Sequence, residues 1–248
     1  MNKRVFTHEN LENLSLNDFV PLSREELDHL KVRRVQEGDV LEVLDGQGHR
    51  GIGVYKSKNL VFQKISETCE APSPRIHLFI GQIKFQNWEW LLEKCAEFGV
   101  ASIQPFISEF VEKNWVVKGT QKRERQLRFL IDAVKQSGQP FCPQLGFPRP
   151  LAELIQEHAT PPRIKHLVAM EPSKDLPSPI IPKPLSDNAM NQVALWVGPE
   201  GGWSDKDQHS LMKLDPTWIS FPHGTFRTET AALFFMSNIL YSTSDGNL

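Results

Sequence analysis

Two segments in the C-terminal third of the chain carry the residue types best suited to chemistry. Residues 198–202 read Gly-Pro-Glu-Gly-Gly, and residues 226–230 read Phe-Arg-Thr-Glu-Thr. Glycines lack a Cβ and therefore let backbone N–H groups approach a ligand closely. The guanidinium of Arg227 must pair with a carboxylate or face a ligand if it lies between a strand and an apolar helix. Together the segments indicate a site that binds a ligand and stabilises negative charge.

A simpler interpretation accounts for part of each segment. A tight turn explains the glycines of residues 198–202. Thr228 or Thr230 can cap a helix whose first turn holds Glu229. The spacing matches neither Gly-x-Gly-x-x-Gly nor the Gly-Lys-Ser/Thr of a P-loop, which disfavours a nucleotide phosphate site. The histidines show no ligand spacing and the three cysteines form no Cys-x-x-Cys pair, so we expect no metal site and no disulfide framework.

Both segments lie where a strand is expected to meet a helix. Residues 193–197 form an apolar run typical of a buried strand and lead into Gly198, while residues 218–221 are the last expected strand before Arg227. Residues 230–236 begin a helix that is apolar on nearly every side, which predicts burial against more than one partner. In open α/β sheets, ligands bind at the carboxyl ends of the parallel strands. We therefore expect the two segments to meet at one edge of a sheet.

The rest of the chain divides into two expected domains. Residues 36–65 alternate apolar and polar side chains with Gly or Asn at the turns, which predicts a small β-barrel-like module. Two prolines within residues 71–75 predict a linker. Beyond it strands alternate with helices, which is the pattern of an α/β domain with a parallel sheet. We place the domains at residues 1–70 and 76–248.

The composition is that of a folded globular protein. The 248 residues are 40% hydrophobic and 23% charged, and the formal net charge is −2. No apolar run reaches the roughly 20 residues of a membrane helix. The charged first residues lack the apolar stretch of a secretory signal. We expect a cytoplasmic protein with no membrane partner.

Positive charge is concentrated in the middle of the chain. Residues 113–149 hold eight Lys or Arg residues against two acidic ones. Several of these cations lie off the apolar stripe of an expected helix, which consists of Leu127, Leu130, Ile131 and Val134. Their position predicts an RNA-binding face, and a solvated helix face is the alternative. The cations concerned are Lys122, Arg123, Arg125 and Arg128.

On these motifs, the chain resembles the RsmE-type methyltransferases of bacterial small-subunit rRNA. Residues 198–204, Gly-Pro-Glu-Gly-Gly-Trp-Ser, and residues 226–232, Phe-Arg-Thr-Glu-Thr-Ala-Ala, are similar to the two signature loops of that family. Residues 94–100 are similar to its Lys-x-x-Glu-Leu-Gly segment. Arg4-Val5-Phe6 resembles its opening strand, and Val32-Arg33-Arg34 resembles part of its N-terminal domain. The resemblance covers nearly the whole chain.

The resemblance implies a fold and a reaction. The implied fold is α/β: a PUA-like β-barrel domain for RNA, then a SPOUT-type parallel sheet with a C-terminal trefoil knot. The implied cofactor is S-adenosylmethionine, and the implied partners are 16S rRNA, in the small ribosomal subunit, and a second copy of the chain in a homodimer. The implied reaction is methylation of N3 of a uridine in the decoding region. Because uracil N3 carries a proton at neutral pH, that proton must be removed or the resulting anion stabilised.

The resemblance also assigns residues by their match to the motifs. Arg227 is implied in stabilising the uracil anion or a nearby phosphate, while Glu229 and Glu200 could orient the base or accept its proton. Arg4, Arg33 and Arg34 join the cations of the middle segment as implied RNA contacts. The implied cofactor-binding residues are Leu195, Gly198, Pro199, Glu200, Gly201, Gly202, Phe221, Phe226 and Thr228.

Three departures from the family pattern bear on the substrate. Ser108-Glu109-Phe110 replaces the usual Ser-Glu-Arg, and residues 135–139, Lys-Gln-Ser-Gly-Gln, lack the acid and the arginine of Glu-Gln-x-x-Arg. Residues 221–225 lack the usual Gly-Pro-Arg order. Two alternatives therefore stay open: a methyltransferase for another RNA site, and a non-catalytic RNA-binding factor in ribosome assembly. Retention of both signature loops speaks against the second.

Overall fold

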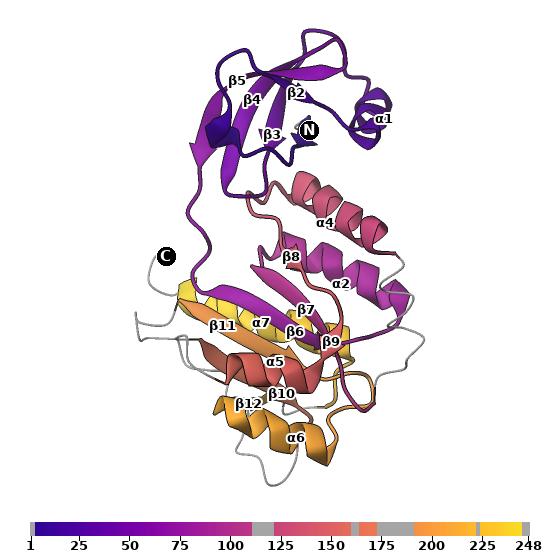
Figure 1. Cartoon of the computed structure of the whole chain (residues 1–248), viewed down its shortest axis with the longest axis vertical. Helices are drawn as coiled ribbons and strands as arrows, with labels where there is room; N and C mark the ends of the chain where they lie inside the picture. The colour runs from indigo at the N-terminus through magenta and orange to yellow at the C-terminus, as the bar shows by residue number, and fades with distance from the viewer. Residues whose placement is uncertain (1–2, 111–121, 160–163, 173–190, 222–223, 245–248) are drawn as a thin grey trace. The chain divides into compact units, whose positions relative to one another are not determined.

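The computed structural model describes residues 3–110, 122–159, 164–172, 191–221 and 224–244 (Figure 1). The chain forms two compact units. The N-terminal unit comprises Met1–Ala71 together with Leu130–Cys142, and the C-terminal unit comprises Pro72–Phe129 together with Pro143–Leu248. The sequence predicts a single boundary at residues 71–75. In the structure residues 130–142, which lie beyond that boundary, also belong to the first unit.

The N-terminal unit is built on a five-stranded sheet with the order β1-β3-β4-β5-β2. Strands β1 and β3 run parallel, and the other neighbours are antiparallel. Because successive side chains of a strand lie on opposite faces of the sheet, every second residue of these strands faces the core. The core contains Leu41, Val43, Leu60 and Phe62 together with Val5. The elements are β1 (Arg4–Phe6), a 3-10 turn (Leu11–Asn13), β2 (Phe19–Pro21), α1 (Arg24–Val32), β3 (Val40–Leu44), β4 (His49–Lys56) and β5 (Asn59–Thr68).

Residues 130–142 complete this unit from far along the chain. They hold the C-terminal half of α4 (Arg123–Ser137) and the segment that follows it. Gly48 N donates to Pro140 O at 3.0 Å, and Cys142 N donates to Gly46 O at 2.9 Å, so the segment pairs with the turn between β3 and β4. Arg50 Nη2 also donates to the carbonyl of Gly138 at 2.8 Å.

A buried ion pair fixes α4 to α1 within the N-terminal unit. Lys135 Nζ lies 2.6 Å from Glu26 Oε1, and the two side chains are only 8% and 7% exposed. Asp132 Oδ1 is a second partner of Lys135 at 3.0 Å. Burial raises the pKa of the Glu26 carboxyl, and the hydrogen bond from Lys135 opposes that rise. Lys135, which departs from the family pattern, is therefore paired with Glu26 inside the unit.

The C-terminal unit is a seven-stranded sheet in which every pairing is parallel, as expected for an α/β domain. The strand order is β12-β10-β11-β6-β7-β8, and β9 also pairs with β7. The strands are β6 (Arg75–Gly81), β7 (Ser102–Ile107), β8 (Gln144–Leu145), β9 (Arg149–Pro150), β10 (Lys165–Met170), β11 (Gln192–Val197) and β12 (Thr217–Ser220). The predicted α/β class, a parallel sheet preceded by a small β unit, is confirmed.

Helices cover both faces of this sheet (Figure 1). Helix α7 (Thr228–Ser244) packs on β6, β11 and α2 (Phe85–Glu97), which agrees with its apolar surface. Helix α5 (Leu151–His158) packs on β7 and on α6 (Asp205–Leu211), which leads into a 3-10 turn at Met212–Leu214. Gly99 ends α2 with φ +66°, a left-handed conformation that favours glycine at the end of a helix. A capping box opens α6, where Asp207 N donates to Ser204 Oγ and Ser204 N donates to the Asp207 carboxylate.

The trefoil knot stays a prediction, because residues 173–190 and 222–223 lie outside the described ranges. Among the helices that are described, none has the length and apolar character needed to cross a membrane.

A buried histidine in the core of the C-terminal unit makes folding sensitive to acid. His166 in β10 accepts a hydrogen bond from Trp196 Nε1 at 3.2 Å through its Nδ1, so this ring nitrogen must lack a proton. Burial, with a smaller contribution from the charge of His158, lowers the pKa of His166 to about 4. The unfolded chain therefore binds a proton at this residue between about pH 6.5 and pH 4 when the folded chain does not, and stability falls as the pH falls through that window.

We expect the free energy of unfolding to fall between pH 7.5 and pH 4.5 in both wild type and His166→Gln. The decrease should be larger in wild type by on the order of 2 kcal/mol. Denaturant titrations at the two pH values measure this difference. Equal losses in the two proteins would show that His166 does not contribute.

Candidate functional site

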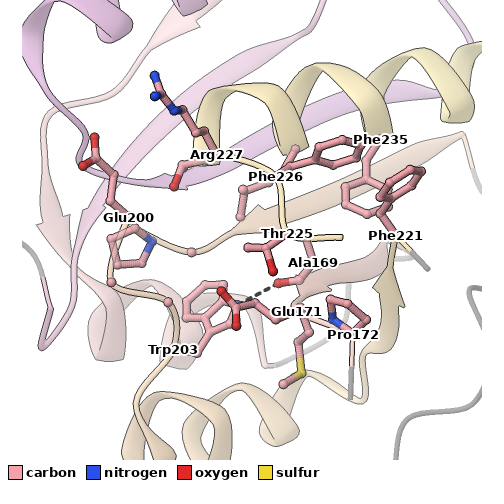
Figure 2. A pocket seen from close by; sticks show the side chains of 18 of the residues that line it. Ala169, Glu171, Pro172, Glu200, Trp203, Phe221, Thr225, Phe226, Arg227 and Phe235 are labelled. Atoms are coloured by element: carbon pink, nitrogen blue, oxygen red, sulfur yellow. Dashed lines mark hydrogen bonds between the residues drawn. The ribbon is translucent and has the colours of Figure 1, made fainter. Parts of the chain in front are cut away.

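A pocket of about 830 Å³ lies at the carboxyl ends of three neighbouring strands of the C-terminal unit (Figure 2). Strand β11 ends at Val197 and continues into the glycine-rich segment, β10 ends at Met170, and β12 ends at Ser220. Residues 224–227, directly before α7, line the pocket on the other side. The lining residues are Lys84, Asn87, residues 169–172, residues 197–203, Gln208, Phe221, residues 224–228, Ala231 and Phe235.

The structure brings the two sequence segments together in this pocket. Nine of the residues singled out from the sequence line it: Gly198, Pro199, Glu200, Gly201, Gly202, Phe221, Phe226, Arg227 and Thr228. Leu195 does not, because its side chain is fully buried in β11. Glu229 is also absent from the lining, since it is buried on α7 with 7% exposure.

Close backbone packing shapes the glycine-rich wall. A Cβ on Gly81, at the end of β6, would lie 2.4 Å from the backbone nitrogen of Pro199, so only glycine leaves room there. Gly202 adopts φ +73°, where side chains are strained. Trp203 supports the segment from the other side, because its Nε1 donates to Ala169 O at 2.8 Å and its ring stacks on Phe106 at 5.4 Å.

Gly81→Ala is expected to lower the free energy of unfolding by about 1–3 kcal/mol, because the added methyl group meets backbone that cannot rotate away. Denaturant unfolding measures this effect. An unchanged midpoint would mean that Pro199 shifts freely and that the wall is not held by β6.

The opposite wall is aromatic. The rings of Phe221 and Phe226 stack with centroids 4.3 Å apart, and Phe234 packs against both at 5.2 Å. Figure 2 shows Phe235 beside Phe221 on the same side of the pocket. Such flat apolar faces suit a planar ring system, while the glycine-rich wall offers backbone groups for polar contacts.

Charged side chains lie around the pocket. Lys84 Nζ is 3.5 Å from Glu200 Oε2. Arg227 is exposed, and its guanidinium has no hydrogen-bond or ion-pair partner within the described ranges. Figure 2 shows the Arg227 and Glu200 side chains at the same end of the pocket. No group of three or more His, Cys, Asp or Glu residues could hold a metal ion in the part of the chain that the structure describes. The pocket can therefore offer a free cation to a negatively charged ligand group.

Several lining residues were missed in the sequence. Lys84 and Asn87 follow the carboxyl end of β6, and Glu171 follows that of β10, so the strand-end rule that located the glycine-rich segment could have located them too. Trp203 and Thr225 adjoin the recognised motifs. Nothing in the sequence indicated that Asn87 contacts Glu229, whose Oε1 accepts a hydrogen bond from Asn87 Nδ2 at 2.9 Å.

The cations predicted to contact RNA occupy different environments. In the N-terminal unit, Arg4 Nε lies 2.5 Å from Glu42 Oε2 and Arg4 Nη1 donates to Lys135 O at 3.1 Å, whereas Arg34 is exposed and Arg33 is half-buried. In the C-terminal unit, Arg123 donates to the carbonyls of Leu145 and Gly146 and lies over the Phe147 ring at 4.1 Å.

Burial lowers the pKa of Arg123. Arg125 pairs with Glu89 at 2.7 Å, Arg128 lies 4.0 Å from Glu124, and Lys122 is exposed. The contact of these residues with RNA stays a prediction.

Comparison with known families decides the kind of protein. The sequence model described as an RNA methyltransferase domain matches residues 70–240, which is more than half of the chain. The chain belongs to this family. A second model, described as an RNA methyltransferase PUA domain, matches residues 22–65, within the N-terminal unit. The matched RNA methyltransferase domain contains every residue that lines the pocket.

Individual relatives agree with the family. The ribosomal RNA small subunit methyltransferase E of Synechocystis sp. is 29% identical over 198 residues, which is 76% of this chain and 61% of the relative. A solved ribosomal RNA small subunit methyltransferase E from Neisseria gonorrhoeae, bound to S-adenosyl methionine, has a TM-score of 0.80 at 23% identity and 98% coverage of both chains, which shows the shared fold. A solved methyltransferase from Legionella pneumophila, in complex with the same cofactor, has a TM-score of 0.76 at 25% identity and 98% coverage of both chains.

Proposed function

We propose that this chain transfers a methyl group from S-adenosylmethionine to N3 of a uridine in the decoding region of 16S rRNA. Membership of the RNA methyltransferase family supports the reaction class. The names of the Synechocystis and Neisseria relatives support small-subunit rRNA as the substrate, and the cofactor bound to the Neisseria and Legionella proteins supports S-adenosylmethionine. The observation that carries the proposal is that both signature segments line one pocket, together with an Arg227 side chain that has no internal partner among the described residues. We further propose that the protein acts in the cytoplasm as a homodimer.

The pocket fits the proposed cofactor. Its volume of about 830 Å³ lies within the roughly 300–1,000 Å³ typical of small-molecule sites. The stacked rings of Phe221 and Phe226 offer an apolar surface to an adenine. The backbone of residues 198–202 would hold polar groups of the cofactor, because glycines leave its N–H and C=O groups accessible. When bound, S-adenosylmethionine supplies a methyl group on a positively charged sulfur.

The side chains at the pocket supply alignment and charge. In-line displacement needs a fixed approach of the base, which the walls of the pocket provide. Arg227 stabilises the negative charge that develops on uracil as N3 loses its proton, because it is the cation at the pocket without an internal partner among the described residues. Glu200 is held by Lys84 and is the lining carboxylate that we propose to orient the base or accept its proton.

RNA binding is proposed to use the exposed cations of both units. Arg34→Gln is expected to weaken rRNA binding and to reduce the slope of log K against log[salt] by about one unit. Arg123→Gln is expected to lower stability instead, because its guanidinium is engaged by the carbonyls of residues 145 and 146. Filter-binding titrations at several salt concentrations distinguish these effects. An unchanged slope for Arg34→Gln would assign that residue to the solvated surface.

The decisive experiment incubates the purified protein with labelled S-adenosylmethionine and small subunits that lack the modification, then maps the label by mass spectrometry. Label on N3 of a decoding-region uridine is the expected result. Label elsewhere would give the chain another RNA site. Cofactor binding without transfer to any RNA would overturn the proposed substrate, and absence of cofactor binding would leave a non-catalytic RNA-binding protein.

A further inference from the structure

Asn87 joins two helices that meet beside the pocket. It lies in the first turn of α2, lines the pocket, and donates from Nδ2 to Glu229 Oε1 at 2.9 Å. Glu229 lies in the first turn of α7, between Thr228 and the remainder of the helix. The two helices pack against each other, so this hydrogen bond ties their N-terminal ends together. It bridges 142 residues of sequence.

The environment of Glu229 makes this hydrogen bond important. Its side chain is buried, with 7% exposure for the residue, and Oε2 has no hydrogen-bond partner among the described residues. A buried polar atom without a partner is unfavourable by about 1–3 kcal/mol. A carboxylate needed only to complement the α7 dipole would do so equally well from an exposed position in the first turn. Its burial against Asn87 therefore requires another explanation.

The residues next to Glu229 supply that explanation. Arg227 and Thr228 precede it directly and both line the pocket, and Ala231 lines the pocket from the following turn. A hydrogen bond that fixes Glu229 therefore fixes the start of α7 and the wall that this segment forms.

We propose that Asn87 is a positioning residue of the pocket, which acts through Glu229 to hold Arg227 and Thr228 in place. The inference rests on the proposed function only in the choice of ligand used to measure it. In this role Glu229 contacts Asn87 rather than the substrate, and the amide of Asn87 sets the position of the first turn of α7.

An exchange of donor and acceptor tests the proposal. Asn87→Asp places two carboxylates opposite each other and is expected to weaken binding of S-adenosylhomocysteine, measured by calorimetry, by about tenfold or more. Glu229→Gln keeps an acceptor oxygen for Asn87 and should change the affinity by less than about threefold. The double variant Asn87→Asp/Glu229→Gln restores the hydrogen bond with the roles exchanged, because the introduced amide donates to the introduced carboxylate. Its affinity should return to within about threefold of wild type.

Gln86→Glu is the matched control. Gln86 is an exposed neighbour on α2 that does not line the pocket, so the same added charge there should leave the affinity unchanged. Additive effects in the double variant, or a loss in Glu229→Gln as large as that in Asn87→Asp, would overturn the proposal. If Asn87→Asp does not fold, Asn87→Ala removes the donor without adding charge and should give a smaller loss in the same direction.

Failure of the proposed function would look different. If wild-type protein binds S-adenosylhomocysteine but methylates no rRNA, the exchange experiment still decides the role of Asn87. If wild-type protein does not bind this ligand, the coupling between Asn87 and Glu229 is measured from melting temperatures instead. The four proteins compared are wild type, Asn87→Asp, Glu229→Gln and the double variant. Recovery of the melting temperature in the double variant is then the expected result, and additive decreases would overturn the inference.

Discussion

Replacing Arg227 with alanine is expected to lower kcat for methyl transfer by about 100-fold or more, while the affinity for S-adenosylhomocysteine changes by less than about threefold. Arg227 lies at the pocket with no internal partner among the described residues, so its charge is available to the reacting base. In the proposed reaction, uracil becomes negative as N3 loses its proton, and a fixed cation stabilises that state more than the neutral base. Single-turnover rates and calorimetry measure the two quantities separately.

Two further variants make this result interpretable. Arg227→Lys keeps the positive charge without the planar guanidinium and should lie between alanine and wild type. Lys213→Ala removes an exposed cation outside the pocket and should leave both quantities unchanged. If Arg227→Ala lowers cofactor affinity as much as it lowers turnover, the residue holds the pocket or the cofactor rather than the transition state.

Lys135→Met is expected to lower the free energy of unfolding by about 3–5 kcal/mol, because it leaves the Glu26 carboxylate buried without its cation. The two side chains are 7–8% exposed and their charged atoms lie 2.6 Å apart. Solvent cannot replace the lost partner at that depth. Denaturant titration at pH 7 measures the change.

The same pair offers an internal test of that explanation. Glu26→Leu/Lys135→Met removes both charges and should recover most of the lost stability, because the penalty comes from the unpaired charge rather than from the missing attraction. Lys31→Met removes the cation of an exposed pair with Asp28 on α1 and should have little effect. A Lys135→Met protein as stable as Lys31→Met would contradict a buried pair at this position.

Local patterns in the sequence predicted the strands and the helix next to the two signature segments, and the edge of the sheet that holds the pocket. The apolar run at residues 193–197 and the glycines after it became β11 and one wall of the pocket, because a buried parallel strand needs continuous apolar residues. The meeting of the two segments followed from a general property of parallel sheets, since strands β10, β11 and β12 end at one edge.

Contacts between distant residues were beyond local patterns. Asn87 reaches Glu229 only because α2 and α7 pack together, and no periodicity in either helix specifies that neighbour. Lys135 stands where the family pattern has an acid, a departure that bears on the substrate, yet its side chain is buried against Glu26, 109 residues away. The return of residues 130–142 to the N-terminal unit likewise depends on backbone hydrogen bonds with Gly46 and Gly48. In the sequence these two glycines indicate only a turn, not the distant segment that pairs with it.

That return of residues 130–142 sets an order for assembly during translation. The first 71 residues leave the ribosome well before the segment that completes their unit, so the nascent N-terminal unit must wait for about 60 to 70 further residues. Until then Glu26 lacks Lys135, and the turn at residues 46–48 lacks its backbone partners. A fragment that stops at residue 71 would stay in that unfinished state. Therefore the β unit, although first in the sequence, becomes complete only after β6 and β7 of the second unit have been synthesised.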